Sequence, residues 1–229
     1  GIYGAASRLL EFSQVFPARL AGVMFPVLSR MMVERNTARR ERTYDRLFRW
    51  FTAISVPAAI LQFVWADEVV GICYGAGYGS STAVLRILSA AMFFSFMGYL
   101  FAYALIASDR QGAFLFLTAL VCAVNIGVNI CAIPLYGPKG AAWVRVLSDV
   151  VSFLAGFGLF FTLIRRISLF TLIQLAVPAI ALFGAVWHFR ESFAAGTIAA
   201  LAYPVLLVVT GGLVSDDLVI FRKLLRRSA

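Results

Sequence analysis

Three arginines recur at a regular interval along the first apolar stretch of the sequence. Arg8, Arg19 and Arg30 are each eleven residues apart, and eleven residues turn an α-helix by about 1100°, only about 20° more than three full turns. The spacing therefore predicts a stripe of arginines along one helix, with steps of about 16 Å. Guanidinium groups bind phosphate through paired hydrogen bonds, so the stripe is suited to an anionic headgroup. Arg30 is expected to be only an anchor at the helix end, and Glu11 lies one turn from Arg8 and is placed to pair with it.

Two more pairs of polar residues are four positions apart, so each pair lies on one face of a helix. Arg145 and Asp149 form one pair, and Asn125 and Asn129 form the other. An ionised side chain within a membrane span costs about 2.5–3.5 kcal/mol, so it usually faces a protein interior or a wet cavity. The ionic pair is either an internal salt bridge that makes insertion tolerable, or a cavity pair that binds a charged group or a coupling ion. The asparagines either form hydrogen bonds between helices or present a polar stripe to a substrate.

Residues typical of catalytic and metal sites are scarce. The sequence has one histidine, His188, and three cysteines, Cys73, Cys122 and Cys131, without a Cys-x-x-Cys motif. It also lacks a glycine-rich phosphate-binding loop. We therefore expect no catalytic residue, no bound metal and no cofactor, apart from a coupling cation or the membrane potential as an energy source.

The composition indicates which elements position these residues. Hydrophobic residues make up 62% of the 229 residues and charged residues 14%, against about 45–50% and about 25% in soluble domains. A soluble globule of this size leaves roughly a third of its unfolded surface exposed, so it could not bury so much apolar surface. These numbers argue against a soluble enzyme, a disordered chain and a disulfide-rich secreted module. The sequence predicts an all-α, polytopic membrane helical bundle of about seven transmembrane helices.

The expected spans are apolar runs close to the length of about 20 residues that a membrane helix needs. They cover approximately 2–32, 47–66, 82–107, 113–133 and 141–163, followed by a C-terminal pair within 168–214. The charged segment 33–46 is expected to be a solvated loop near anionic headgroups. Residues 215–229 are expected to form a basic amphipathic helix on the inner leaflet.

The net charge of +9 comes from 20 Lys and Arg residues against 11 Asp and Glu residues. Most basic residues fall on one side of the predicted membrane, within 30–49, 110, 165–166 and 222–227, whereas the opposite connections hold only Lys139 and Arg190. By the positive-inside rule the first side, with the C-terminus, is cytoplasmic. The charge therefore orients the chain and does not indicate nucleic acid. Because the sequence begins without Met and within a span, we expect the C-terminal part of a longer protein whose earlier part holds an odd number of spans.

Three motifs resemble a known transporter family in their order and spacing. They are Gly1 to Phe12 with Phe25 to Arg30, Gly75 to Tyr78 with Leu85 to Leu88, and Pro134 to Trp143. Together they resemble the polysaccharide flippases, of O-antigen, exopolysaccharide or lipid II type, within the multidrug/oligosaccharidyl-lipid/polysaccharide exporter superfamily. The resemblance covers essentially the whole chain.

The resemblance implies the C-terminal half of a two-lobe transporter that opens alternately to each leaflet. Residues 1–163 would belong to the second lobe and residues 168–214 to an additional helix pair, and Arg8 matches a cavity arginine of the lipid II flippases. The implied function is translocation of a polyprenyl-diphosphate-linked oligosaccharide from the inner to the outer leaflet of the bacterial cytoplasmic membrane, for cell-surface polysaccharide biosynthesis. The candidate residues of the substrate cavity are Arg8, Glu11, Arg19, Asn125, Asn129, Arg145 and Asp149.

Other functions remain open. A cation-coupled drug or small-molecule exporter of the same fold would be indicated by an intramembrane carboxylate cluster, and a membrane scaffold for glycan assembly would not transport. A membrane polymerase or ligase needs a sizeable outer loop with polar catalytic residues, so the short connections argue against an enzyme. The expected partners are a lipid-linked saccharide, membrane lipids, the N-terminal helices of the same protein and polysaccharide polymerase machinery, without nucleic acid.

Overall fold

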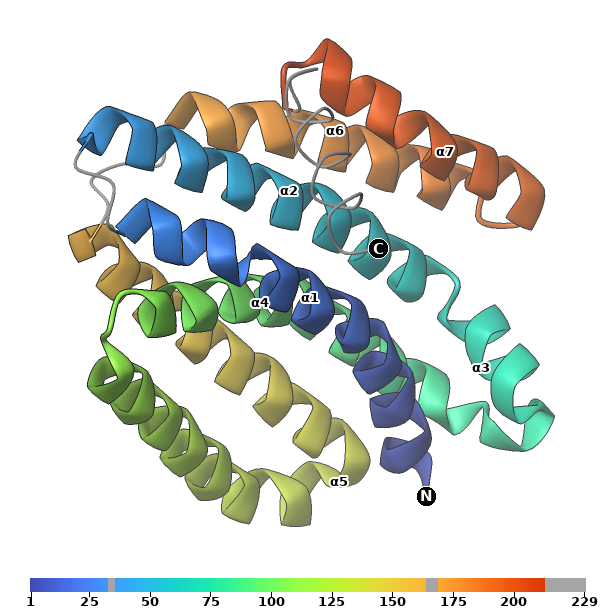
Figure 1. Cartoon of the computed structure of the whole chain (residues 1–229). Helices are drawn as coiled ribbons and strands as arrows, with labels where there is room; N and C mark the ends of the chain where they lie inside the picture. Colours follow the sequence, from blue (N-terminus) through green and yellow to red (C-terminus); the bar gives the residue numbers. More distant parts are fainter. Residues whose placement is uncertain (33–35, 164–168, 213–229) are drawn as a thin grey trace.

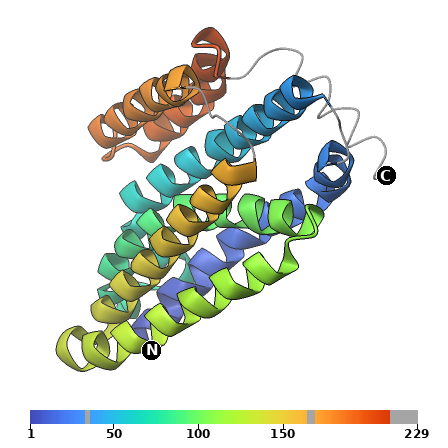
Figure 2. The same cartoon turned by 90° about the vertical axis from the view of Figure 1, so that its left-hand side faces the viewer.

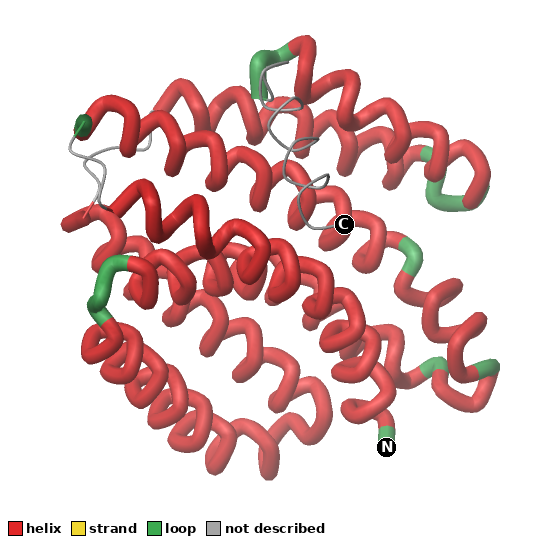
Figure 3. The backbone as a smooth tube through the Cα atoms, in the orientation of Figure 1, coloured by secondary structure: helices red, strands yellow, loops and turns green. Residues whose placement is uncertain are grey.

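The computed structural model describes residues 1–32, 36–163 and 169–212, and this part of the chain is built from helices without a β-strand (Figures 1 and 3). The prediction of an all-α fold is confirmed. The predicted amphipathic helix at 215–229 lies outside the described residues. In chain order the elements are α1 (Ile2–Met32), α2 (Thr37–Val64), α3 (Ala66–Tyr74), the 3₁₀ turn η1 (Ala76–Tyr78), α4 (Ser80–Ala107), α5 (Gln111–Leu163), α6 (Leu169–His188) and α7 (Phe193–Val209).

Four of the described helices, α1, α2, α4 and α5, are long and apolar enough to cross a membrane. Helices α6 and α7 add two shorter apolar stretches, Ile173–His188 and Gly196–Val209. This set of helices suits a multi-pass membrane protein. The grouping of the helices into a second lobe and an additional pair stays a prediction.

Helix α5 is a hairpin of two antiparallel arms, which Figure 2 shows in green and olive. The chain reverses at Gly137, whose φ of 56° and ψ of −135° are easily reached only by a residue without a Cβ. Pro138 follows at once and begins the second arm, where its missing N–H leaves no helical hydrogen bond unmade. The arms approach closely at Gly140, where a Cβ would lie 2.4 Å from a backbone oxygen of the first arm. Because the reversal takes only a few residues, the first arm continues past residue 133 and the second arm begins before residue 141. Both arms are therefore longer at the turn than the predicted helices at 113–133 and 141–163.

The prediction of a solvated loop at 33–46 is wrong from Thr37 onward, where α2 begins. Asn36 caps this helix, since its side-chain oxygen accepts a hydrogen bond from the backbone N–H of Arg39 at 3.1 Å. Tyr44 is buried against the bundle. The charged residues therefore lie on a helix with one buried side, and the cap and this buried side favour the helix over a loop.

Helix α4 lies at the centre of the bundle and packs against α1, α2, α3 and α5 (Figure 1). Its buried side chains include Met92, Phe96 and Leu100. Where α4 meets the second arm of α5, Gly156 leaves room for the ring of Phe101, since a Cβ at Gly156 would lie 3.1 Å from that ring. Apolar side chains gain little by leaving lipid, so close packing of this kind holds membrane helices together.

Helices α6 and α7 form a second hairpin that packs along α2, at the top of the view in Figure 1. At one end, Arg49 of α2 donates hydrogen bonds to Gln174 Oε1 at 3.0 Å and to the carbonyl oxygen of Gly211 at 2.7 Å. Toward the other end, the ring of Trp65 lies directly against Gly196, where a Cβ would be 2.4 Å from ring atom Cζ2. A hydrogen-bonded contact and a close packing contact thus attach the hairpin to α2.

We expect Gly196→Ala to weaken this attachment, because the new methyl group would have to displace the Trp65 ring. Overpacking of this kind costs about 1–3 kcal/mol, and each kcal/mol lowers the melting temperature by about 2–4 °C in a chain of this size. Thermal unfolding of the purified protein in detergent measures the effect. The control is Gly184→Ala in α6, where nothing lies within 4 Å of the new Cβ. Equal melting temperatures for the two variants would contradict the close contact.

Candidate functional site

A polar side chain lies near the middle of α1, on the face that packs against α4. Gln14 is buried, and its Nε2 donates a hydrogen bond to Ser95 Oγ of α4 at 2.9 Å. Apolar residues such as Leu10 and Ala21 make up much of the same buried face. Leaving a buried amide unsatisfied costs about 1–3 kcal/mol, so Gln14 needs partners on the neighbouring helices.

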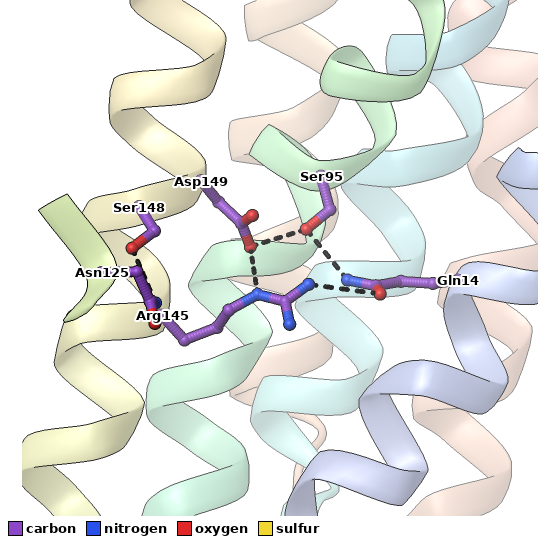
Figure 4. A network of polar contacts seen from close by, with 6 residues as sticks. All are labelled: Gln14, Ser95, Asn125, Arg145, Ser148 and Asp149. Atoms are coloured by element: carbon purple, nitrogen blue, oxygen red, sulfur yellow. Dashed lines mark hydrogen bonds and ion pairs between the residues drawn. The ribbon is translucent and has the colours of Figure 1, made fainter. Parts of the chain in front are cut away.

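Three further hydrogen bonds connect this contact to the second arm of α5 (Figure 4). Ser95 Oγ donates to Asp149 Oδ2 at 2.7 Å, and Arg145 Nε donates to the same oxygen at 3.0 Å. Arg145 Nη2 donates to Gln14 Oε1 at 3.4 Å, so the four hydrogen bonds form a closed ring. These four residues, Gln14, Ser95, Arg145 and Asp149, are called the polar ring below. The polar ring joins α1, α4 and α5.

The polar ring balances its own charge. Arg145 and Asp149 form an ion pair at 3.0 Å, and their side chains are 34% and 15% exposed. The neutral groups of Gln14 and Ser95 satisfy further hydrogen-bonding positions of the pair. This geometry corresponds to the internal salt bridge, one of the two alternatives that the sequence leaves open. A binding role for the pair stays a prediction.

Asn125 and Asn129 lie on the first arm of α5, and Asn125 connects this arm to the second. Asn125 Nδ2 donates to Ser148 Oγ at 3.0 Å, and Asn129 Nδ2 donates to Asn125 Oδ1 at 3.0 Å. Ser148 precedes Asp149 in the chain, so this contact lies beside the polar ring (Figure 4). Hydrogen bonding between helices accounts for Asn125, whereas the hydrogen bond of Asn129 stays within the first arm. Contact of either asparagine with a substrate stays a prediction.

The other predicted site residues lie at exposed positions of α1. Arg8, Glu11 and Arg19 are exposed, as is Arg30, so no described element covers this face of the helix. In the described part of the chain, none of these four residues forms a hydrogen bond or an ion pair with the polar ring. Arg8 and Glu11 form no ion pair with each other in the described part of the chain, although their spacing of one turn allows it.

Gln14 and Ser95 are candidate site residues that the sequence predictions did not include. Each is a neutral polar residue within a largely apolar helix, and helical spacing does not connect the two. The one usable signal is Gln14 itself, because an amide within a span requires a hydrogen-bond partner. Among the described residues, no group of three or more His, Cys, Asp or Glu side chains is placed to hold a metal ion.

Comparisons with known proteins match the chain to flippases. A protein-family model described as "Lipid II flippase MurJ" matches residues 2–209. The chain is also 24% identical, over 152 residues, to the "Probable low-salt glycan biosynthesis flippase Agl15" of Haloferax volcanii. That alignment covers 66% of this chain and 32% of the relative, so the chain spans about a third of the relative's length.

We expect Asp149→Asn to destabilise the protein, because it leaves the charge of Arg145 without its counterion. Losing one partner of a hydrogen-bonded charged pair costs about 1–3 kcal/mol. The double variant Arg145→Gln/Asp149→Asn removes both charges and should recover most of that loss. Thermal unfolding in detergent, arranged as a double-mutant cycle, measures the coupling between the two residues.

The control for this cycle is Asp67→Asn. The ion pair of Asp67 with Arg86 is exposed, and exposed pairs contribute about 0–1 kcal/mol. If Asp149→Asn lowers the melting temperature no more than Asp67→Asn does, the polar ring does not hold the helices together.

Proposed function

The chain belongs to the lipid II flippase MurJ family, and from this we propose that it is part of a transporter that flips a polyprenyl-diphosphate-linked oligosaccharide across a membrane. The movement runs from the inner to the outer leaflet of the bacterial cytoplasmic membrane and serves the synthesis of cell-surface polysaccharide. The relative in Haloferax volcanii is likewise described as a flippase. Since the chain spans about a third of that relative, it contributes one portion of the transport pathway.

The exposed arginines of α1 are the observation that carries this proposal. Arg8 and Arg19 project from a long apolar helix, and no described element covers them. An arginine inside a membrane is costly unless it faces a polar partner or a wet cavity. A diphosphate is such a partner, because guanidinium groups bind its oxygens in bidentate fashion. The α1 face with Arg8 and Arg19 therefore lines the pathway of the headgroup.

The polar ring has a positioning role in this proposal. Gln14 lies between Arg8 and Arg19 in the sequence, and its hydrogen bonds tie the middle of α1 to α4 and α5. The arginine-bearing face of α1 is thereby held in a fixed orientation relative to the bundle. The charges of Arg145 and Asp149 serve the scaffold, while those of Arg8 and Arg19 remain available to the substrate.

The membrane potential supplies a driving force in this proposal. We place the basic end, with Arg30 and the first turns of α2, on the cytoplasmic side, and the C-terminus on the same side. Moving one elementary charge across 100 mV changes its free energy by about 2.3 kcal/mol. A diphosphate with two negative charges would gain about 4–5 kcal/mol on leaving a negative interior at that potential.

A coupling cation is a further part of the proposal. The Oδ1 atom of Asn129 is buried and accepts no hydrogen bond in the described part of the chain. An amide oxygen of this kind is a ligand that hard cations accept. Binding of a cation there would connect the ion gradient to the packing of the two α5 arms.

We expect Arg8→Ala and Arg19→Ala, made in the full-length protein, each to slow flipping of a labelled polyprenyl-diphosphate saccharide in proteoliposomes. A charge-assisted contact contributes about 1.5–3 kcal/mol, which corresponds to a loss of about tenfold or more in rate. The rate should partly recover in Arg8→Lys, since a lysine keeps the charge but not the paired hydrogen bonds.

The matched control is Arg30→Ala, which removes an exposed arginine at the end of the same helix. Its flipping rate should stay within about twofold of the unaltered protein, as expected for an anchor outside the substrate path. Unchanged flipping in both Arg8→Ala and Arg19→Ala would overturn the proposed role of α1.

A further inference from the structure

A cavity of about 390 Å³ opens at the end of the bundle where α2 ends and α3 and α4 begin. Figure 1 shows that α3 and the turn between α6 and α7 lie at this same end, on the right of the view. The lining of the cavity includes Phe63, Asp67, Glu68, Arg86, Trp187 and Arg190. The volume lies within the range of about 300–1,000 Å³ that is usual for small-molecule sites.

The charged groups of this cavity are only partly paired with one another. Arg86 forms an ion pair with Asp67. The guanidinium carbon of Arg190 lies 4.9 Å from the centre of the Trp187 ring. Within the described residues, neither Arg190 nor Glu68 takes part in an ion pair. The cavity therefore offers one cation and one carboxylate to a ligand, and its total charge is zero.

The stacking on Trp187 prepares Arg190 for an anion. A guanidinium held over an aromatic ring keeps the N–H groups at its edge available for hydrogen bonds. Arg190 is also one of only two basic residues on the connections opposite the basic end, the other being Lys139. The positive-inside rule does not account for Arg190, because this end of the bundle is opposite the basic end. Its position therefore supports a local role for Arg190 in binding.

The cavity lies at the level of the membrane boundary. Trp187 and His188 end the apolar helix α6, and aromatic residues of this kind mark the headgroup region. Beneath the cavity, a row of aromatic rings follows the seam between α2 and α6. The ring of Phe183 lies 5.9 Å from that of Trp187 and 6.5 Å from that of Phe63, measured between centroids. The polar cavity thus continues into an apolar surface along the helices.

We propose that this cavity binds the headgroup of a zwitterionic phospholipid with a primary amine, phosphatidylethanolamine. Its phosphate accepts hydrogen bonds from Arg190, and its ammonium group donates to Glu68. The acyl chains run along the seam beside Phe183, which is 43% exposed. The cavity is neutral, and its carboxylate and guanidinium without an ion pair lie on different elements, Glu68 on α3 and Arg190 just after α6. This favours a zwitterion over an anionic lipid. A primary ammonium has three N–H donors for carboxylates, whereas a choline group has none.

The bound lipid would connect α3 to the end of α6. In the described structure the α6–α7 hairpin packs against α2, and near this end the contact of Trp65 with Gly196 attaches it. A headgroup between Glu68 and Arg190 adds a second connection there. We therefore expect the lipid to stabilise docking of the hairpin, independently of whether the transporter flips its substrate.

Native mass spectrometry of the full-length protein in mild detergent tests this assignment. The protein is mixed with equal amounts of phosphatidylethanolamine, phosphatidylglycerol and phosphatidylcholine, and the retained lipids are counted. The unaltered protein should retain phosphatidylethanolamine about three- to fivefold more than either other lipid, as expected for two partly exposed charged contacts. Glu68→Gln and Arg190→Gln should each reduce this preference toward one.

A control variant and a second measurement complete the test. Arg110→Gln, at the basic end of the bundle, should leave the lipid preference unchanged. Phosphatidylethanolamine should also raise the melting temperature of the unaltered protein more than that of the Glu68→Gln/Arg190→Gln variant. Equal retention of the three lipids, a preference for phosphatidylglycerol, or a phosphatidylethanolamine preference that survives both substitutions would overturn the proposal.

Discussion

A charge enclosed among apolar helices has to be neutralised within the protein, and the arrangement of this bundle depends on how Arg145 and Asp149 meet that constraint. Water is scarce in such surroundings, so an ion pair alone leaves hydrogen-bonding positions unsatisfied. Ser95 and Gln14 fill those positions, and each comes from a different helix. Satisfying one ion pair therefore links the positions of α1, α4 and α5, and the close contact of Gly156 with Phe101 lies on the same interface between α4 and α5.

Only part of the polar ring could be predicted from the sequence. Arg145 and Asp149 are four residues apart on one helix, so their contact is a local property of the chain. Gln14 and Ser95 are separated by 81 positions, and their meeting depends on how α1 crosses α4. Helical spacing carries no information about such a crossing, since it describes each helix alone. The contact between Gln14 and Ser95 could therefore be found only from the three-dimensional structure.

The fold class was predictable because the composition leaves few alternatives, whereas helix boundaries depended on single residues. The reversal between the arms of α5 lies in the gap between the predicted helices 113–133 and 141–163, where proline and glycine signal a turn. The many charged residues in 33–46 favour a solvated loop, whereas α2 begins at Thr37. The signals that decide for a helix there are the cap at Asn36 and the burial of Tyr44.

Since the chain reverses at Gly137, the two arms of α5 are joined by a tight turn and have to enter the membrane together. The hydrogen bond of Asn125 to Ser148 can form inside this hairpin before it meets any other helix. Gln14 and Ser95 belong to segments that are synthesised earlier. The segments that carry the hydrogen-bond partners of Arg145 and Asp149 are thus made before the hairpin, so the costly charges reach the bilayer after a donor for the carboxylate and an acceptor for the guanidinium have been synthesised.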